Sequence, residues 1–165
     1  MEKNIDVNLT SPFIKGWVCG FVDGEGCFCV SFTIRKSMPC GIEVRPSFSI
    51  SQKKHSLESL QIIHKFFDCG GIRYSKGDGT YKYETRSIQD IKNKILPFFE
   101  ENNLFTKKKE DFTIFKNICK LILKGEHLNP YGLETIITQS YKLNGSGKRK
   151  HEINDLLKFI SKLKV

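Results

Sequence analysis

Three glycines spaced by four residues are the feature that most restricts how this chain folds. Gly16, Gly20 and Gly24 lie in an otherwise apolar stretch of helical character. A glycine inside a helix costs about 0.5–1 kcal/mol relative to alanine, so three glycines on one helix face need a compensating contact. A face without side chains lets a second helix approach until the two backbones touch. The pattern therefore predicts an interface helix over residues 13 to 23.

Two carboxylates follow where the apolar stretch ends. Asp23 and Glu25 are separated by a single residue and precede a run rich in β-branched and aromatic residues. If two such helices pack side by side, their carboxylates repel each other unless a cation lies between them, and oxygen ligands suit Mg²⁺ or Ca²⁺. The alternative is a surface turn, Asp-Gly-Glu-Gly, in which the glycines only reverse the chain. The residues alone leave both interpretations open.

The segment over residues 18 to 26, Val-Cys-Gly-Phe-Val-Asp-Gly-Glu-Gly, resembles the signature of the LAGLIDADG homing endonucleases. The match covers the positions from Gly20 to Gly26, whereas Val18-Cys19 replaces the Leu-Ala opening of the signature. The strands, basic loops and helices predicted after this segment are those that the family requires. The resemblance therefore extends from residue 13 over nearly the whole chain.

The composition indicates a polyanionic partner. Lys and Arg total 27 against 18 Asp and Glu, which gives a net charge of +9 and a pI of about 9.3. A small protein this basic usually binds nucleic acid. A length of 165 residues allows one domain, which we expect over residues 13 to 165 after a flexible N-terminus of residues 1 to 12.

The same composition bears on location. No apolar run is long enough to span a bilayer and no signal peptide is recognisable, so we expect no membrane partner and an intracellular location. The abundance of Lys, Ile, Asn and Phe is typical of an AT-rich organellar gene, which favours a chloroplast or a mitochondrion. The six cysteines contain no CxxC pair and are expected to be reduced thiols. Cys27 and Cys29 share a strand face, but no histidine follows at ligand spacing, which disfavours zinc.

Hydrophobic periodicity predicts an α+β fold with an αββαββα core, a four-stranded antiparallel sheet and additional C-terminal helices. One hairpin is expected over residues 27 to 36 and 42 to 52, with its turn at 37 to 41, and a second over 72 to 76 and 81 to 87. Helices are expected over residues 13 to 23, 55 to 67, 88 to 102, 110 to 123, 133 to 143 and 153 to 163.

Alternation gives each hairpin one apolar and one polar face. The expected apolar face consists of Phe28, Val30, Phe32, Ile34, Val44, Pro46, Phe48, Ile50, Ile72, Tyr74, Tyr81 and Tyr83. The polar face mixes donors and acceptors, which suits the major groove of DNA, although an ordinary solvated sheet face alternates in the same way. The residues expected to contact DNA are Ser31, Thr33, Arg35, Glu43, Arg45, Ser47, Ser49, Ser51, Arg73, Ser75, Lys82, Glu84 and Arg86.

The resemblance implies an active site at the end of the interface helix. It assigns Glu25 as the catalytic carboxylate and a metal ligand, with Gly24 beside it at the metal site. Gln52, at the end of the second strand, is expected to orient water. Lys107, in the run of lysines 107 to 109, is expected to reach the scissile phosphate. The alternative for this run is a solvated basic loop.

The resemblance also implies Mg²⁺ as cofactor, with Ca²⁺ binding without supporting cleavage and Mn²⁺ able to substitute. It implies a homodimer whose interface is formed by Gly16, Gly20, Phe21, Asp23 and Gly24. Near the C-terminus, Lys148, Arg149 and Lys150 form a basic loop that is expected to contact phosphates of double-stranded DNA. The alternative is a solubilising linker between helices.

Together these features predict a homing endonuclease. As a homodimer it would make a double-strand break with 3′ overhangs in a long pseudo-palindromic site, by Mg²⁺-dependent phosphodiester hydrolysis. Two alternatives share the fold: a maturase that binds intron RNA, and a DNA-binding protein that does not cleave.

Overall fold

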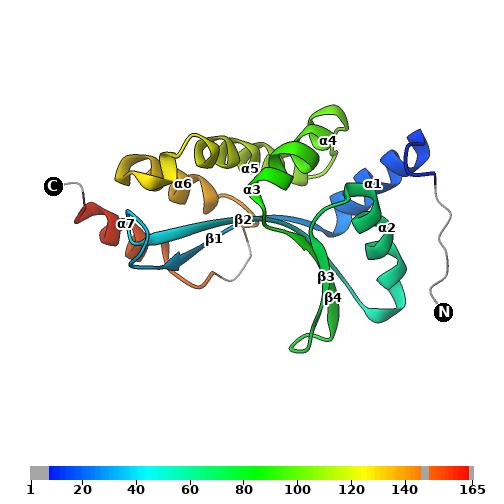
Figure 1. The fold of residues 1–165 in the computed structure, drawn as a ribbon, viewed down its shortest axis with the longest axis horizontal. Coiled ribbons are helices and arrows are strands. Elements are labelled where there is room, and N and C mark those ends of the chain that lie inside the picture. Colours follow the sequence, from blue (N-terminus) through cyan, green and yellow to red (C-terminus); the bar gives the residue numbers. More distant parts are fainter. Residues whose placement is uncertain (1–7, 146–148, 164–165) are drawn as a thin grey trace. The chain divides into compact units, whose positions relative to one another are not determined.

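The computed structural model describes residues 8–145 and 149–163 (Figure 1). Its chain forms two compact units, of which the first comprises the described parts of residues 1–27 and 48–109. The second comprises the described parts of residues 28–47 and 110–165. A single domain over residues 13 to 165 stays a prediction.

Four strands form one sheet with the order β1-β2-β4-β3. They are β1 (Gly26–Ile34), β2 (Ile42–Gln52), β3 (Gly71–Ser75) and β4 (Thr80–Thr85). Strand β4 pairs antiparallel with β2 on one side and with β3 on the other, so Glu84 lies opposite both Ser49 and Gly71. The predicted α+β class with a four-stranded antiparallel sheet is confirmed.

The first unit has its own aromatic core. Its helices are α1 (Pro12–Glu25), η1 (Lys54–Ser56), α2 (Leu57–Phe67), α3 (Ile88–Asp90), η2 (Ile91–Ile95) and α4 (Leu96–Glu101). The ring of Phe48 lies at its centre, with centroids 5.7 Å from Phe67, 5.7 Å from Phe99 and 6.2 Å from Tyr83. Edge-to-face contacts of this kind favour a fixed arrangement of the rings.

The second unit is built around Phe28 of β1. Its helices are α5 (Lys108–Leu123), which starts in the first unit, and η3 (Glu126–Leu128), α6 (Pro130–Ser140) and α7 (Ile153–Ser161). The ring of Phe28 lies 5.5 Å from that of Phe112 and 5.4 Å from that of Phe115, both on α5. Each unit therefore buries aromatic side chains from one part of the sheet against helices.

Helix α1 begins and ends where its sequence provides the appropriate residues. Ser11 is the N-cap, and its hydroxyl accepts a hydrogen bond from the backbone N–H of Ile14 at 3.3 Å, with Pro12 at the first helical position. At the other end, a Cβ on Gly26 would lie 2.6 Å from a methyl group of Val22. Glycine is therefore required where the chain leaves the helix and enters β1.

The two sides of α1 differ sharply. Its buried side consists of Ile14, Val18, Cys19 and Val22. Gly16, Gly20 and Gly24 are exposed, and a Cβ placed on any of them would meet no atom within 4 Å beyond its chain neighbours and its own helix backbone. Among residues 8–145 and 149–163, nothing packs against the glycine face.

Helix α3 does not continue regularly to α4, although the sequence predicted one helix over residues 88 to 102. In the η2 turn, the backbone N–H of Leu96 donates to the carbonyl of Ile91, five residues earlier, as in a π-helix. Pro97 follows and has no N–H to donate to the preceding turn. The wider turn accommodates this missing donor.

Four residues differ in exposure from what their strand faces predicted. Ile34 and Tyr74 are exposed rather than buried, because each lies near the end of its strand, where fewer elements cover it. Ser47 and Ser49 are buried rather than exposed, with Ser49 only 4% accessible. The side chain of Ser49 is too short to rise above the longer Glu84, which lies directly opposite it.

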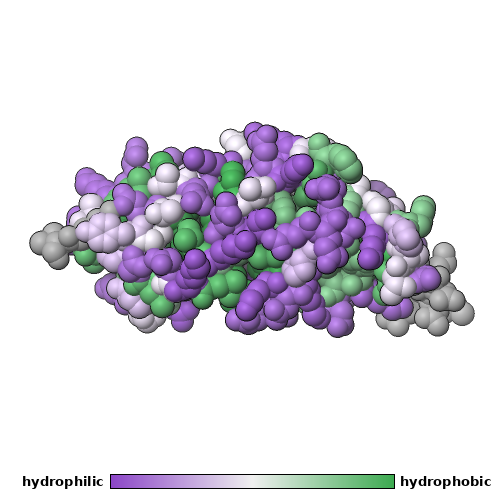
Figure 2. Space-filling model, turned by 90° about the horizontal axis from the view of Figure 1, so that it is seen from above, coloured by the Kyte–Doolittle hydropathy of each residue, from purple (hydrophilic) through white to green (hydrophobic). Residues whose placement is uncertain are grey.

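The face of the molecule seen in Figure 2 is mainly polar. Figure 2 shows hydrophilic side chains over most of the face that it presents, with hydrophobic patches between them. Within residues 8–145 and 149–163, no helix is both long and apolar enough to cross a membrane.

The core of the first unit is testable with Phe48→Ala. Removing a ring that is fully buried among three others should lower the free energy of unfolding by about 3–5 kcal/mol, measured by chemical denaturation. The matched control is Phe105→Ala, because the Phe105 side chain is 89% exposed and its loss should change stability by less than about 0.5 kcal/mol. Equal effects of the two substitutions would contradict this description of the core.

Candidate functional site

The C-terminal end of α1 presents a carboxylate to solvent. Glu25 is the last residue of the helix and is exposed, as is Gly24 before it. The preceding turn is held by Val22, which is fully buried, so the core anchors the backbone at the end of the helix. The exposed carboxylate of Glu25 can therefore bind a ligand from outside the chain.

Asp23 has a different role from Glu25. Its carboxylate accepts hydrogen bonds from the backbone N–H of Phe105 at 2.8 Å and of Thr106 at 3.1 Å, and from the Thr106 hydroxyl at 2.9 Å. The Thr106 hydroxyl oxygen in turn accepts from the backbone N–H of Lys108, the first residue of α5, at 3.2 Å. Asp23 thus supports the start of α5 within its own chain, and its place in a dimer interface stays a prediction.

This link brings the lysine run to the end of α1. Lys107 directly follows Thr106 and is exposed. Gln52, the last residue of β2, is half-buried and pairs with Tyr81 of β4. Glu25, Gln52 and Lys107 all belong to the first compact unit. The structure therefore joins Lys107 to the end of α1, while the catalytic roles of all three residues remain predictions.

A divalent metal ion would find only part of a ligand set in one chain. Within the described ranges, no group of three or more His, Cys, Asp and Glu side chains could hold a metal ion. None of the six cysteines forms a disulfide, and their reduced state stays a prediction. The exposed carboxylate of Glu25 suits Mg²⁺ or Ca²⁺, which prefer oxygen ligands, but it needs further ligands from a phosphate, from water or from a second chain.

The polar face of the first hairpin carries an ion-pair cluster centred on Glu43. One oxygen of Glu43 lies 3.2 Å from Nη1 of Arg35, and the other lies 2.7 Å from Nη2 of Arg45. The hydrogen bond and charge of Arg45, followed by those of Arg35, hold the pKa of Glu43 below its usual value. Ser31, Thr33 and Ser51 on this hairpin, and Ser75 on β3, retain partial or full exposure, as expected for the polar face of each hairpin.

A second cluster, on the β3–β4 hairpin, is centred on Glu84. Its carboxylate lies 2.9 Å from Nζ of Lys82, 2.9 Å from Nε of Arg86 and 3.2 Å from Nη2 of Arg73. The cations that the sequence predicted on the sheet face are therefore held by two acids rather than standing alone. Alternation alone does not predict these partners.

Arg149 does not extend freely from the C-terminal loop. Its Nη2 donates to the carbonyls of Ser140 at 2.6 Å and Leu143 at 2.8 Å, and its guanidinium lies 4.4 Å from the ring centroid of Tyr141. It caps the last carbonyls after α6, and its expected contact with DNA phosphates stays a prediction. Lys150 is exposed, and Lys148 lies outside the described residues.

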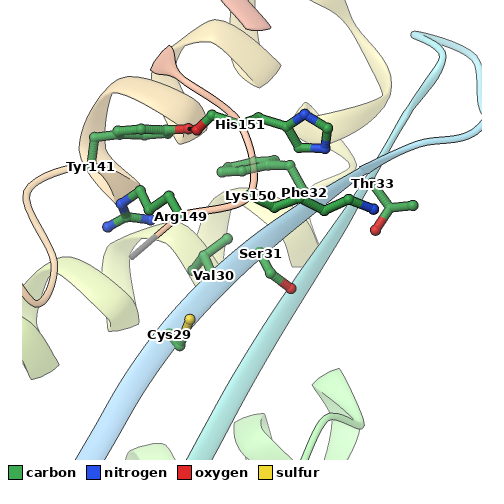
Figure 3. A pocket seen from close by; sticks show the side chains of 9 residues that line it. All are labelled: Cys29, Val30, Ser31, Phe32, Thr33, Tyr141, Arg149, Lys150 and His151. Atoms are coloured by element: carbon green, nitrogen blue, oxygen red, sulfur yellow. Dashed lines mark hydrogen bonds between the residues drawn. The ribbon is translucent and has the colours of Figure 1, made fainter. Parts of the chain in front are cut away.

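A pocket of about 330 Å³ lies between β1 and this loop, within the second unit (Figure 3). Figure 3 shows Cys29, Val30 and Ser31 on the strand, across the pocket from Tyr141 and Arg149. The hydroxyl of Tyr141 donates to the carbonyl of His151 at 2.5 Å and so joins the start of the loop to its end.

Asn144 fixes the other side of this loop and was missed by the sequence reasoning. Its Nδ2 donates to the carbonyl of Phe28 at 2.6 Å, and its backbone N–H donates to the buried carboxylate of Asp111 at 3.3 Å. Its φ of 48° is left-handed, a conformation that asparagine tolerates better than most residues. An asparagine beside Gly145 after a helix was the available signal.

The comparisons with known proteins agree on one family. The model of the LAGLIDADG endonuclease family matches residues 18–119. A relative from Neurospora crassa, named probable intron-encoded endonuclease 2, is 35% identical over 141 residues, which are 83% of this chain and 30% of the relative. The chain therefore spans less than a third of that relative's length.

Two solved structures are similar over most of this chain. The archaeal intron-encoded homing endonuclease I-Vdi141I complexed with DNA has a TM-score of 0.83 and 30% identity, covering 92% of this chain and 97% of that one. I-SmaMI bound to an uncleaved DNA target in the presence of calcium ions has a TM-score of 0.81 and 31% identity, covering 87% and 48%.

The role of Asp23 as an anchor is testable with Asp23→Ala. The substitution leaves the N–H groups of Phe105 and Thr106 without their acceptor and should lower the free energy of unfolding by about 1–3 kcal/mol, measured by urea denaturation. Glu101→Ala, which removes an exposed carboxylate from α4 in the same unit, should cost less than about 0.5 kcal/mol. If both variants unfold at the same urea concentration, Asp23 is not an anchor.

Proposed function

The chain belongs to the LAGLIDADG endonuclease family, and from that premise we propose that it is a site-specific DNA endonuclease that works as a homodimer. It makes a double-strand break with 3′ overhangs in a long pseudo-palindromic site. An organellar location and intron RNA as a further partner stay predictions.

One observation carries the proposal: α1 combines an exposed glycine face with an exposed carboxylate at its end. Gly16, Gly20 and Gly24 leave room for a second helix to approach backbone to backbone. One chain supplies one Glu25, whereas a double-strand break requires chemistry on two strands. A two-fold axis beside the glycine face supplies the second carboxylate and matches a pseudo-palindromic site.

The ligand chemistry fits a shared metal site. Glu25 and its two-fold mate, with Gly24 beside each, hold the ion, and their mutual repulsion makes a cation between them favourable. Mg²⁺, when bound there, supplies Lewis-acid polarisation of the phosphate and lowers the pKa of bound water. Ca²⁺ binds the same oxygen ligands and supports binding without cleavage, while Mn²⁺ substitutes for Mg²⁺.

The remaining residues act on the phosphodiester directly. Gln52 orients the attacking water through its side-chain amide, which both donates and accepts hydrogen bonds. Lys107 places a positive charge beside the scissile phosphate and stabilises the charge that develops in the transition state. The anchor formed by Asp23 and Thr106 supports this placement, because it attaches the residue before Lys107 to the end of α1.

Glu25→Gln tests the catalytic assignment. The amide keeps the size of the side chain but removes the charge that attracts the metal ion, so Mg²⁺-dependent cleavage should fall at least ~10³-fold, or about 4 kcal/mol. DNA duplexes recovered from a randomised library provide the substrate, and binding of these duplexes in Ca²⁺ should be unchanged.

The control for this test is Glu58→Gln, which removes an exposed acid from α2 and should cut at the wild-type rate. Wild-type cleavage by Glu25→Gln would contradict the assignment. A wild-type protein that binds selected duplexes but cuts none would favour the non-cleaving alternative.

Gly20→Leu tests the dimer. A Cβ at Gly20 meets no atom within 4 Å, and the exposed position directs the added side chain to the face on which a second helix would lie, so the fold should persist while the dimer dissociates. The dissociation constant, measured by analytical ultracentrifugation, should rise at least ~100-fold, or about 2.8 kcal/mol. Gly77→Leu, in the β3–β4 turn, also has open space and should leave the dimer intact. A Gly20→Leu dimer of wild-type affinity would refute the proposed interface.

A further inference from the structure

Glu84 occupies an unusual position on the sheet. It lies on β4 between Ser49 of β2 and Gly71 of β3, which are its direct cross-strand partners. Neither partner has a bulky side chain, so three long cationic side chains can converge on the carboxylate from the same face. As a result the Glu84 side chain is only 10% exposed, whereas those of Arg73 and Arg86 are 59% and 54% exposed.

The cluster offsets the repulsion between like charges in the β3–β4 hairpin. Arg73 and Lys82 lie directly opposite each other on β3 and β4, and like charges in that position destabilise a strand pair. Oε1 of Glu84 accepts from Lys82, and Oε2 lies within ion-pair distance of both Arg73 and Arg86. The carboxylate therefore allows three cations to occupy one small area of the sheet.

Glu84 itself is not available to a partner molecule. Burial raises its pKa, but the hydrogen bond and charge of Lys82 and the charges of Arg86 and Arg73 outweigh burial and hold the pKa below its usual value. The group is thus ionised at neutral pH, and both oxygens already accept from cations. Glu84 can therefore affect a bound polyanion only by holding the arginines in position.

Those arginines retain donors for recognition. Arg86 uses Nε for its ion pair and Arg73 uses Nη2, and a guanidinium carries further N–H groups in a rigid fork. An arginine whose fork is fixed loses less conformational entropy when it forms a bidentate contact. The preferred bidentate partner in a major groove is guanine, through O6 and N7.

The first hairpin repeats the arrangement with different residues. Glu43 is bound by Arg35 and Arg45, whose side chains are 55% and 43% exposed, while that of Glu43 is 21% exposed. Both hairpins therefore place a less accessible acid beneath more accessible arginines. The repetition indicates that the acids belong to the recognition surface as orienting groups.

We propose that Glu84 is a positioning residue that determines specificity: it holds Arg73 and Arg86 for contact with guanine and reduces binding to unrelated DNA. The proposal rests on the proposed function, because it requires that this sheet face contacts DNA. The second effect follows from charge, since the acid offsets part of the positive charge that attracts any phosphate backbone.

The test compares Glu84→Gln with wild type on a randomised library of DNA duplexes, in Ca²⁺ so that cleavage does not interfere. Wild type is expected to select guanine at some positions of the site. Arg73→Ala and Arg86→Ala should each lose the preference for guanine at the positions that depend on the arginine removed. Glu84→Gln should lose preference at the same positions, and its ratio of affinities for the selected duplex and for the unselected library should fall about tenfold. Its affinity for the unselected library should rise, with a salt dependence steeper by about one unit.

Glu58→Gln is the matched control, because it removes one negative charge from an exposed position on α2 of the same unit. It should leave the selected sequence and the affinity ratio unchanged. If Glu84→Gln keeps the wild-type guanine preference, or weakens both affinities equally, Glu84 only stabilises the hairpin and the proposal is overturned. Failure of the wild type to enrich any sequence would instead overturn the proposed function.

A second variant covers the case in which Glu84→Gln does not fold. Glu84→Asp keeps the charge but shortens the side chain, so it reaches fewer of the three cations. It should show an intermediate loss of preference at the arginine-dependent positions and a salt dependence equal to that of wild type. An unchanged preference in Glu84→Asp, together with a normal unfolding transition, would also overturn the proposal.

Discussion

The hydrogen bonds of Asp23 hold together the two segments on which the candidate active site depends. Asp23 lies in the last turn of α1, two residues before Glu25, and its carboxylate satisfies the backbone N–H groups of Phe105 and Thr106. Those groups precede α5, where a helix start leaves donors without intrahelical partners. The carboxylate of Asp23 therefore joins the backbone segment before Lys107 to the helix end that carries Glu25.

Acids have distinct tasks in this basic chain. Asp23 orders backbone, Glu43 and Glu84 hold cations, and Glu25 alone of the four is an exposed carboxylate at the end of a helix. The carboxylates of Asp23, Glu43 and Glu84 function by accepting hydrogen bonds from donors within the chain. Glu25 owes its proposed function to the opposite condition, since a ligand for a metal ion must keep its lone pairs available.

Much of the fold could be predicted because periodicity records which face of an element is buried. The limits of β2, from Ile42 to Gln52, agree with the prediction. The burial of Ser49 and the capping contacts of Arg149 could not be predicted, because they depend on Glu84 and on the carbonyls after α6, which are distant in sequence. Likewise, the motif indicated Asp23 and Glu25 as a pair, but only the position of Thr106 separates their roles.

The three glycines of α1 lower the stability of the single chain but leave one face of the helix flat. Alanine at Gly16, Gly20 and Gly24 meets no neighbour in this structure and should add about 0.5–1 kcal/mol of helix stability at each position. A laboratory screen that rewards only the melting temperature of isolated chains would therefore replace these glycines early. The resulting helix would be convex where it is now flat, and engineering for heat resistance would remove the proposed contact surface before it harmed the fold.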